Sequence, residues 1–248
     1  MYKLFPEMFD RPDNGMPFAG ILFNVLCFYS MPFLVILLSI DMPNNDLTVS
    51  WFDGVYHLAC AVMSVVLYRT YLTESFLNVQ LNWKGFWKTV TICVGVIFAI
   101  ALLIFLWGYL AGSYDVVWFA TMMLPMPAND LFMVFGALIE ANPVVGLLCV
   151  GVMAPVTIGC LFYATGFAPM ACRNWKLGYV AVALMAAIPR VCNAITFWDP
   201  MTELALYLVQ LPAHLVACWG YQKTDTVWTP IAVLSITNLI AGLIILML

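Results

Sequence analysis

The sequence PVVGLLCVGVMAPVTIGCLFYATGFA, residues Pro143–Ala168, decides the fold of this chain. It contains no Asp, Glu, His, Lys or Arg, and the uncharged stretch extends from Ala141 to Cys172. A helix of about 20 predominantly apolar residues is long enough to cross the hydrocarbon core of a bilayer. The stretch is therefore predicted to form a transmembrane helix.

The rest of the chain is also rich in apolar residues and poor in charged ones. Of its 248 residues, 65% are hydrophobic and 9% are charged, so a soluble domain could not cover its apolar surface. Backbone groups must be satisfied internally in lipid, and no β-barrel alternation is visible, which favours helices. The predicted fold class is all-α, a polytopic membrane helical bundle. About seven spans are expected: Met16–Ile40, Trp51–Leu72, Trp87–Ala111, Pro143–Ala168, Leu177–Ile195, Met201–Tyr221 and Trp228–Leu248.

The Lys and Arg residues predict an orientation. Lys3 and Arg11 precede the first span, and six others lie in or beside alternate connections: Arg69, Lys84, Lys88, Arg173, Lys176 and Lys223. Cytoplasmic connections of membrane proteins carry an excess of Lys and Arg. The chain is therefore predicted to be an integral membrane protein with a cytoplasmic N-terminus and an external C-terminus.

Three segments of the sequence, one of them partly within the uncharged stretch, form a motif pattern. The first joins Asn129-Asp130 to APVTIGCLFY at Ala154–Tyr163, the second is Ala187–Val191, and the third is YQKTDTVWTPI at Tyr221–Ile231. The pattern resembles the CPBP family (CAAX proteases and bacteriocin-processing enzymes, also called Abi), which are intramembrane proteases. Family members have Asn-Gln and then Ala-Pro, two glutamates, Phe and Arg in the first segment. The second is Phe-x-x-x-His, and the third is a Tyr-x-Arg-Thr-Gly-Ser-Leu-Trp-x-Pro-Ile turn before a His-x-x-x-Asn helix.

This resemblance implies an organisation for the chain. Residues 1–248 are expected to form a single membrane domain in a bacterial cytoplasmic membrane. Residues 1–128 would supply N-terminal helices, and residues 129–248 a CPBP-like core.

The chemical groups of the family pattern are absent at the matching positions. The two glutamates, the arginine, the phenylalanine and histidine of the second segment, and the histidine of the third fall on Ile158, Gly159, Tyr163, Ala187, Val191 and Leu234. Only the asparagine remains, as Asn238. The resemblance thus implies a pseudoenzyme. Ile158, Val191 and Leu234 are expected to form a dry apolar centre, since an unpaired buried charge is costly.

The chemical requirements of peptide hydrolysis also indicate an inactive protein. Peptide hydrolysis needs a base that activates water and donors that stabilise the oxyanion, and a metal needs several His or carboxylate ligands. The chain has only two histidines, His57 and His214, and its cysteines form no metal-ligand cluster, so neither a metal nor another cofactor is expected. Nucleic acid is not an expected partner, because there is no basic patch. Cys160 and His214 could form a thiol–imidazole pair, but packing roles are the favoured interpretation.

Arg190 is the one basic residue that does not fit the predicted orientation, because it lies within or near the outer end of the span Leu177–Ile195. An ionisable residue in a membrane segment is a functional candidate by default. An ion pair closing the outer face is preferred over a ligand or partner contact. The acidic residues within its reach in the sequence are Asp130, Glu140, Asp199 and Glu203, and His214 is a further candidate for such a site.

The sequence therefore predicts a catalytically inactive membrane protein. It would be a scaffold or regulatory partner of another integral membrane protein, or would bind a peptide or lipid-like ligand in the former substrate cleft, with membrane lipid around it. Three alternatives stay open: an intramembrane protease with non-standard residues, a bacteriocin self-immunity protein, and a transporter subunit.

Overall fold

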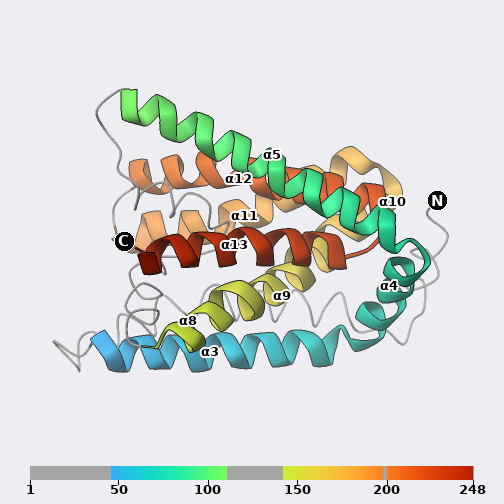
Figure 1. The fold of residues 1–248 in the computed structure, drawn as a ribbon, viewed down its shortest axis with the longest axis horizontal. Coiled ribbons are helices and arrows are strands. Elements are labelled where there is room, and N and C mark those ends of the chain that lie inside the picture. Colours follow the sequence, from blue (N-terminus) through green and yellow to red (C-terminus); the bar gives the residue numbers. More distant parts are fainter. Residues whose placement is uncertain (1–45, 111–141, 198–199, 248) are drawn as a thin grey trace.

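The computed structural model describes residues 46–110, 142–197 and 200–247, and within these ranges helices are joined by short turns and no strand occurs (Figure 1). This confirms the all-helical fold. The elements, of which η1 and η2 are π-helical, are α3 (Asp46–Leu67), α4 (Arg69–Leu81), α5 (Trp83–Leu110), α8 (Pro143–Leu148), η1 (Cys149–Met153), α9 (Ala154–Ile158), η2 (Gly159–Phe167), α10 (Ala168–Arg173), α11 (Trp175–Phe197), α12 (Pro200–Thr224) and α13 (Trp228–Met247).

The uncharged stretch forms one continuous helix, Pro143–Arg173, of 31 residues. The Asn142 side chain caps its start by accepting a hydrogen bond from the Val145 amide at 3.3 Å, and Pro143 occupies the first turn. Two wide π-helical turns interrupt it: the Ala154 amide donates to the Cys149 carbonyl, and the Ala168 amide to the Tyr163 carbonyl. Such turns often mark functional positions in helices.

Three helices of the described ranges are long and apolar enough to cross a membrane: Trp83–Trp107, Pro143–Arg173 and Pro200–Thr224. A fourth crossing results if the bent pair α3–α4 is counted as one span. The expected spans from Trp87 onward fall on described helices except for their end residues Ala111 and Leu248, which lie outside the described residues, as does Met16–Ile40. The three qualifying helices agree with a membrane protein.

The second expected span, Trp51–Leu72, is wrong at its C-terminal end. The helix stops at Leu67, Tyr68 leaves helical geometry at φ −102° and ψ 13°, and α4 departs at 78° to the described part of α3. One face of α4 is buried and the opposite face is exposed. Helix α4 packs this buried face across the end of the bundle, at 78° to α3, and does not continue through it.

Helix α13 lies in the middle of the bundle, between α5 and α12 on one side and α8–α9 on the other (Figure 1). The close approach of α13 to the long helix requires glycine. A Cβ atom at Gly151 would overlap the side chain of Leu239, and one at Gly159 would overlap that of Ile231. Small residues of this kind let membrane helices pack backbone to backbone.

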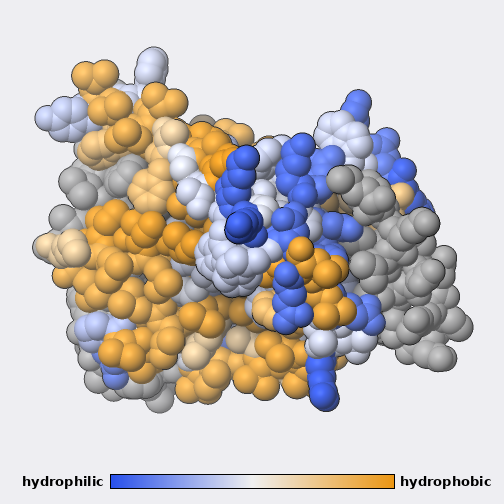
Figure 2. All heavy atoms as spheres, turned by 45° about the vertical axis from the view of Figure 1, so that its right-hand side comes forward, coloured by the Kyte–Doolittle hydropathy of each residue, from blue (hydrophilic) through white to orange (hydrophobic). Residues whose placement is uncertain are grey.

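The connections α3–α4, α4–α5, α10–α11 and α12–α13 all lie at one end of the molecule, on the right in Figure 1. Figure 2 shows hydrophilic side chains gathered toward this end, whereas the other coloured side chains of the visible face are mostly hydrophobic. The basic residues that the sequence assigns to alternate connections therefore share one end of the bundle.

Candidate functional site

The Ala154–Tyr163 part of the first motif segment lies in the core, whereas Asn129-Asp130 lies outside the described residues. Ile158, Tyr163 and Leu234 are each 0% exposed and belong to one cluster of buried residues. Gly159, at the position of the family's second glutamate, faces Ile231 with no room for a side chain. The motif positions Ile158 and Tyr163 on the long helix and Leu234 on α13 thus belong to one buried cluster.

Asn238 has a structural reason to be present. At the end of η1 the hydrogen bonds have π-helical spacing, in which an amide donates to the carbonyl five residues earlier. The amide of residue 155 would therefore donate to the carbonyl of Val150, but Pro155 has no amide hydrogen. The Asn238 Nδ2 group instead donates to the Val150 carbonyl at 3.0 Å. The asparagine therefore satisfies a carbonyl that the proline leaves without a donor. Its Oδ1 atom is buried and makes no hydrogen bond to any residue that the structure describes.

The second motif segment is in a different register from the expected one. Val191 is 55% exposed, so the expectation that it contributes to the dry centre is wrong, and Ala187 is only half-buried. The inward residues of α11 lie one position earlier, at Ala186 and Arg190, which are 8% and 7% exposed. They keep the four-residue spacing of the motif on the face that packs against the bundle.

Arg190 forms the ion pair that the sequence predicts. Its Nη1 donates to Glu203 Oε2 at 3.0 Å, and its Nη2 donates to Gln210 Oε1 at 2.7 Å. All three side chains are buried, and they join α11 to α12. The ion pair with Glu203 is therefore confirmed, whereas the alternative partners Asp130, Glu140 and Asp199 lie outside the described residues.

His214 lies further along the same face of α12. Its Nδ1 is hydrogen-bonded to Tyr163 Oη at 3.1 Å, and its ring lies 5.3 Å from that of Phe162. Tyr163 occupies the position of the family's arginine. Within the described ranges the Cys160 thiol makes no hydrogen bond to His214, although both residues are buried. The structure therefore does not place these two residues as a nucleophile and its base.

Sequence reasoning missed Gln210 and the contact between Tyr163 and His214. A signal was present in α12, where Glu203, Gln210 and His214 recur at intervals of seven and four residues. That spacing keeps polar residues on one face of a helix. In a membrane helix such a polar stripe indicates an inward face.

The third motif segment forms the turn between α12 and α13. Asp225, at the position of the family's glycine, has a φ of 52°, the left-handed region in which glycine is the preferred residue. Asp is among the few other residues that tolerate it. Burial raises the pKa of the Asp225 carboxyl above its ordinary value.

Helix α4 holds this turn through a set of hydrogen bonds, which we call the turn clamp. Ser75 Oγ accepts from the Val227 amide at 3.0 Å and lies 2.8 Å from Thr226 Oγ1. Asn78 Nδ2 donates to the Asp225 carbonyl at 2.7 Å. Trp228 Nε1 donates to the carbonyl of Leu72 at 2.9 Å. The hydroxyl groups of Tyr71 and Tyr221 are also hydrogen-bonded to each other.

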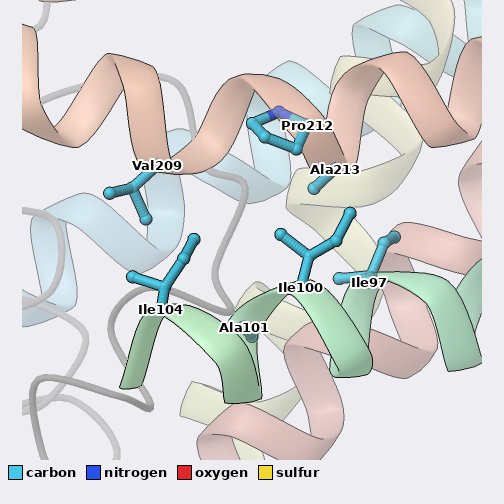
Figure 3. Close-up of a pocket in the computed structure, with 7 residues that line it drawn as sticks. All are labelled: Ile97, Ile100, Ala101, Ile104, Val209, Pro212 and Ala213. Carbon is cyan, nitrogen blue, oxygen red and sulfur yellow. The ribbon is translucent and has the colours of Figure 1, made fainter. Parts of the chain in front are cut away.

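One hollow lined by described residues lies away from the motif positions. It is a shallow apolar groove between α5 and α12, lined by Ile97, Ile100, Ala101, Ile104, Val209, Pro212 and Ala213 (Figure 3). None of these side chains can donate, accept or transfer a proton. Among the described residues, no three His, Cys, Asp or Glu side chains are grouped so that they could hold a metal ion.

Comparisons of the chain with family models, with curated proteins and with solved structures gave no match.

Proposed function

We propose that this protein is a catalytically inactive member of the CPBP family that binds another integral membrane protein as a scaffold or regulatory partner. The observation that carries the proposal is the complete burial of Ile158, Tyr163 and Leu234 in one apolar cluster. These are the positions where the family pattern has a glutamate, an arginine and a histidine. None of the three side chains can take over the work of the glutamate or the histidine of the family pattern, and the one imidazole beside them, His214, is engaged by Tyr163 Oη at 3.1 Å.

Two features of the scaffold support the family assignment. The left-handed residue of the α12–α13 turn is Asp225, at the motif's glycine position. Pro155 and Asn238, one from the first segment and one from the third, act on the same carbonyl group of Val150. Both features explain in physical terms why residues that carry no chemistry are present at these positions.

The packed centre favours a protein partner over a ligand in the former cleft. Helix α5 offers a surface for such a partner, because it has the smallest buried share among the three helices long enough to cross a membrane. A Cβ atom added at Gly95 on α5 would meet nothing within 4 Å. Leu103 and Trp107, further along α5, are 67% and 79% exposed.

Site-specific photo-crosslinking in native membranes tests the proposal. A photoreactive phenylalanine analogue replaces Leu103 on α5 or Leu184 on α11, which is 63% exposed. One discrete adduct, formed with the same protein that co-purifies in gentle detergent, is expected from one of these two faces. The matched variant His214→Ala should leave the adduct unchanged.

A protease would behave differently. Cleavage of a membrane peptide by the purified chain, lost on substitution of Cys160 or His214 by Ala, would overturn the proposal. The absence of any adduct at either face and at Val96 on α5 would contradict a stable partner.

A further inference from the structure

The first two turns of α5 carry two exposed lysines, Lys84 and Lys88. They are four residues apart on one helix, so their side chains are neighbours on its surface, with Cβ atoms about 5–6 Å apart. Neither lysine forms an ion pair with a residue that the structure describes. Because the two side chains are long and leave the helix on the same side, both ammonium groups can reach one anion.

Two exposed indoles lie beside these lysines. Trp83 and Trp87 are 54% and 40% exposed, and their ring centroids are 5.5 Å apart. Trp87 follows Lys84 by three residues, which places these two side chains next to each other. Both indoles contact Phe86, at centroid distances of 6.2 Å and 5.2 Å, and Phe86 is buried in a cluster that α5 shares with α12 and α13. A buried ring therefore holds in place a pair of tryptophans, a residue enriched at the depth of lipid headgroups.

An apolar surface follows the lysines along α5. Ile92 follows Lys88 by four residues and is 42% exposed, so it continues the row of the two lysines. Gly95 lies beside Ile92 on the same face, and a Cβ atom there would meet nothing within 4 Å. The helix rises about 10 Å from Lys88 to Gly95, which fits within one leaflet of a bilayer whose hydrocarbon core is about 30 Å thick. A ligand that contacts this whole face needs an anionic head and a hydrocarbon tail, whereas a soluble anion satisfies only the first requirement.

The other cations at this end of the molecule are not paired in this way. Among the described Lys and Arg residues, Lys84 and Lys88 alone are one turn apart on a single helix. Arg173 ends α10 and Lys176 lies in α11, and Asn174 between them has an extended backbone, at φ −157° and ψ 123°. Arg173 and Lys176 therefore offer the same charge without a shared helix face.

We propose that Lys84 and Lys88 bind the phosphate-bearing headgroup of an anionic phospholipid. The two indoles lie at the level of its glycerol, and an acyl chain runs along Ile92 and Gly95. Cations next to a membrane-spanning helix attract anionic headgroups, and here a single helix presents the charges, the aromatic rings and the apolar surface in the order in which a phospholipid presents its parts. The site lies outside the motif positions and does not depend on the proposed partner.

Native mass spectrometry of the full-length chain tests this site. The protein is titrated in detergent with phosphatidylglycerol or phosphatidylcholine, and the retained lipid is counted. In the double variant Lys84→Gln/Lys88→Gln, retention of phosphatidylglycerol should fall about tenfold, which corresponds to about 1.4 kcal/mol, and retention of phosphatidylcholine should not change. An excess of inorganic phosphate should not displace phosphatidylglycerol from the unchanged protein. Displacement would show that the charged head alone is recognised, and would overturn the assignment to a lipid.

The chain offers a matched control at the same end. Arg173→Gln/Lys176→Gln removes the same charge and should lower phosphatidylglycerol retention by less than about twofold. Lys84→Arg/Lys88→Arg should retain the lipid. Equal losses in the two glutamine doubles would show only general electrostatic attraction, and unchanged retention in both would remove the site; either result overturns the proposal. All variants replace exposed residues, and an unchanged melting temperature without added lipid shows that they fold.

Discussion

At the scale of single residues, Pro155 and Asn238 act as one unit. The proline removes an amide hydrogen from a π-helical turn, and the asparagine supplies a donor to the same carbonyl from another helix. A buried carbonyl without a donor costs about 1–3 kcal/mol. The asparagine is thus retained for the backbone of the long helix and needs no catalytic explanation.

A double-mutant cycle checks this relation. Asn238→Leu should lower the free energy of unfolding by about 1–2 kcal/mol, because the Val150 carbonyl loses its donor. In a Pro155→Ala background, where the residue 155 amide can serve that carbonyl, the same substitution should cost about 1 kcal/mol less. Unfolding in detergent micelles measures both values, and equal costs in the two backgrounds would show that the residues act independently.

Gly159 and Gly95 provide a second contrast between single residues. Gly159→Ala places a methyl group against Ile231 and should destabilise the protein by about 1–3 kcal/mol through overpacking. Gly95→Ala meets open space and should leave stability unchanged or raise it by about 0.5–1 kcal/mol, because alanine favours the helix. Thermal unfolding of both variants measures the difference. The same cost at both positions would show that the approach to α13 is not the constraint at Gly159.

At the scale of elements, Arg190, Glu203 and Gln210 connect α11 to α12. Arg190→Met should destabilise the fold by about 3–5 kcal/mol, because it leaves the Glu203 carboxylate buried without its partner. Arg190→Met/Glu203→Met should recover most of this loss, since a buried ion pair can be replaced by apolar side chains at little cost. Chemical unfolding of the single and double variants distinguishes this from a site for an external ligand, for which the single variant would fold normally.

The α12–α13 turn predicts a dependence of stability on pH. Burial raises the pKa of Asp225 in the folded protein above its ordinary value of 3.8. Its contribution is therefore fully favourable below about pH 4 and is lost as the pH rises through the raised pKa. Asp225→Asn keeps a residue that tolerates the left-handed φ but cannot ionise.

The melting temperatures of Asp225→Asn and the unchanged protein should coincide at about pH 3.5 and diverge toward pH 7, with the variant more stable. A constant difference across this range would show that the half-buried carboxylate carries no penalty.

At the scale of the whole molecule, the shared position of the turns predicts the orientation. Cysteine introduced at Thr73 on α4, at the end with the turns, should react with a membrane-impermeant maleimide only after cells are lysed. Cysteine introduced at Met201, which is 75% exposed at the start of α12, should react in intact cells. The protein without introduced cysteines gives the background, and the reverse pattern would invert the predicted orientation.

The sequence predicted the positions of the helices far better than it predicted which face of each helix is buried. Composition and the spacing of turns were enough to locate the long helix Pro143–Arg173 and the helices that follow it. The bend at Tyr68 could not be predicted, because no proline or glycine interrupts the chain there and the cause is the docking of α4 on a distant turn. Helix α11 has apolar residues all round, so only its contact with α12 shows that Arg190 faces inward and Val191 outward.

The turn clamp also sets an order of events during synthesis. Ser75 leaves the ribosome about 150 residues before its partners Thr226 and Val227, and Asn78 about as far before its partner Asp225. Because a chain is synthesised from its N-terminus, α4 lacks these hydrogen-bond partners until nearly the whole protein has been translated. A chain that ends before Trp228 lacks the final helix and the hydrogen bond to Leu72 together. The turn clamp can therefore form only after synthesis has reached the last helix.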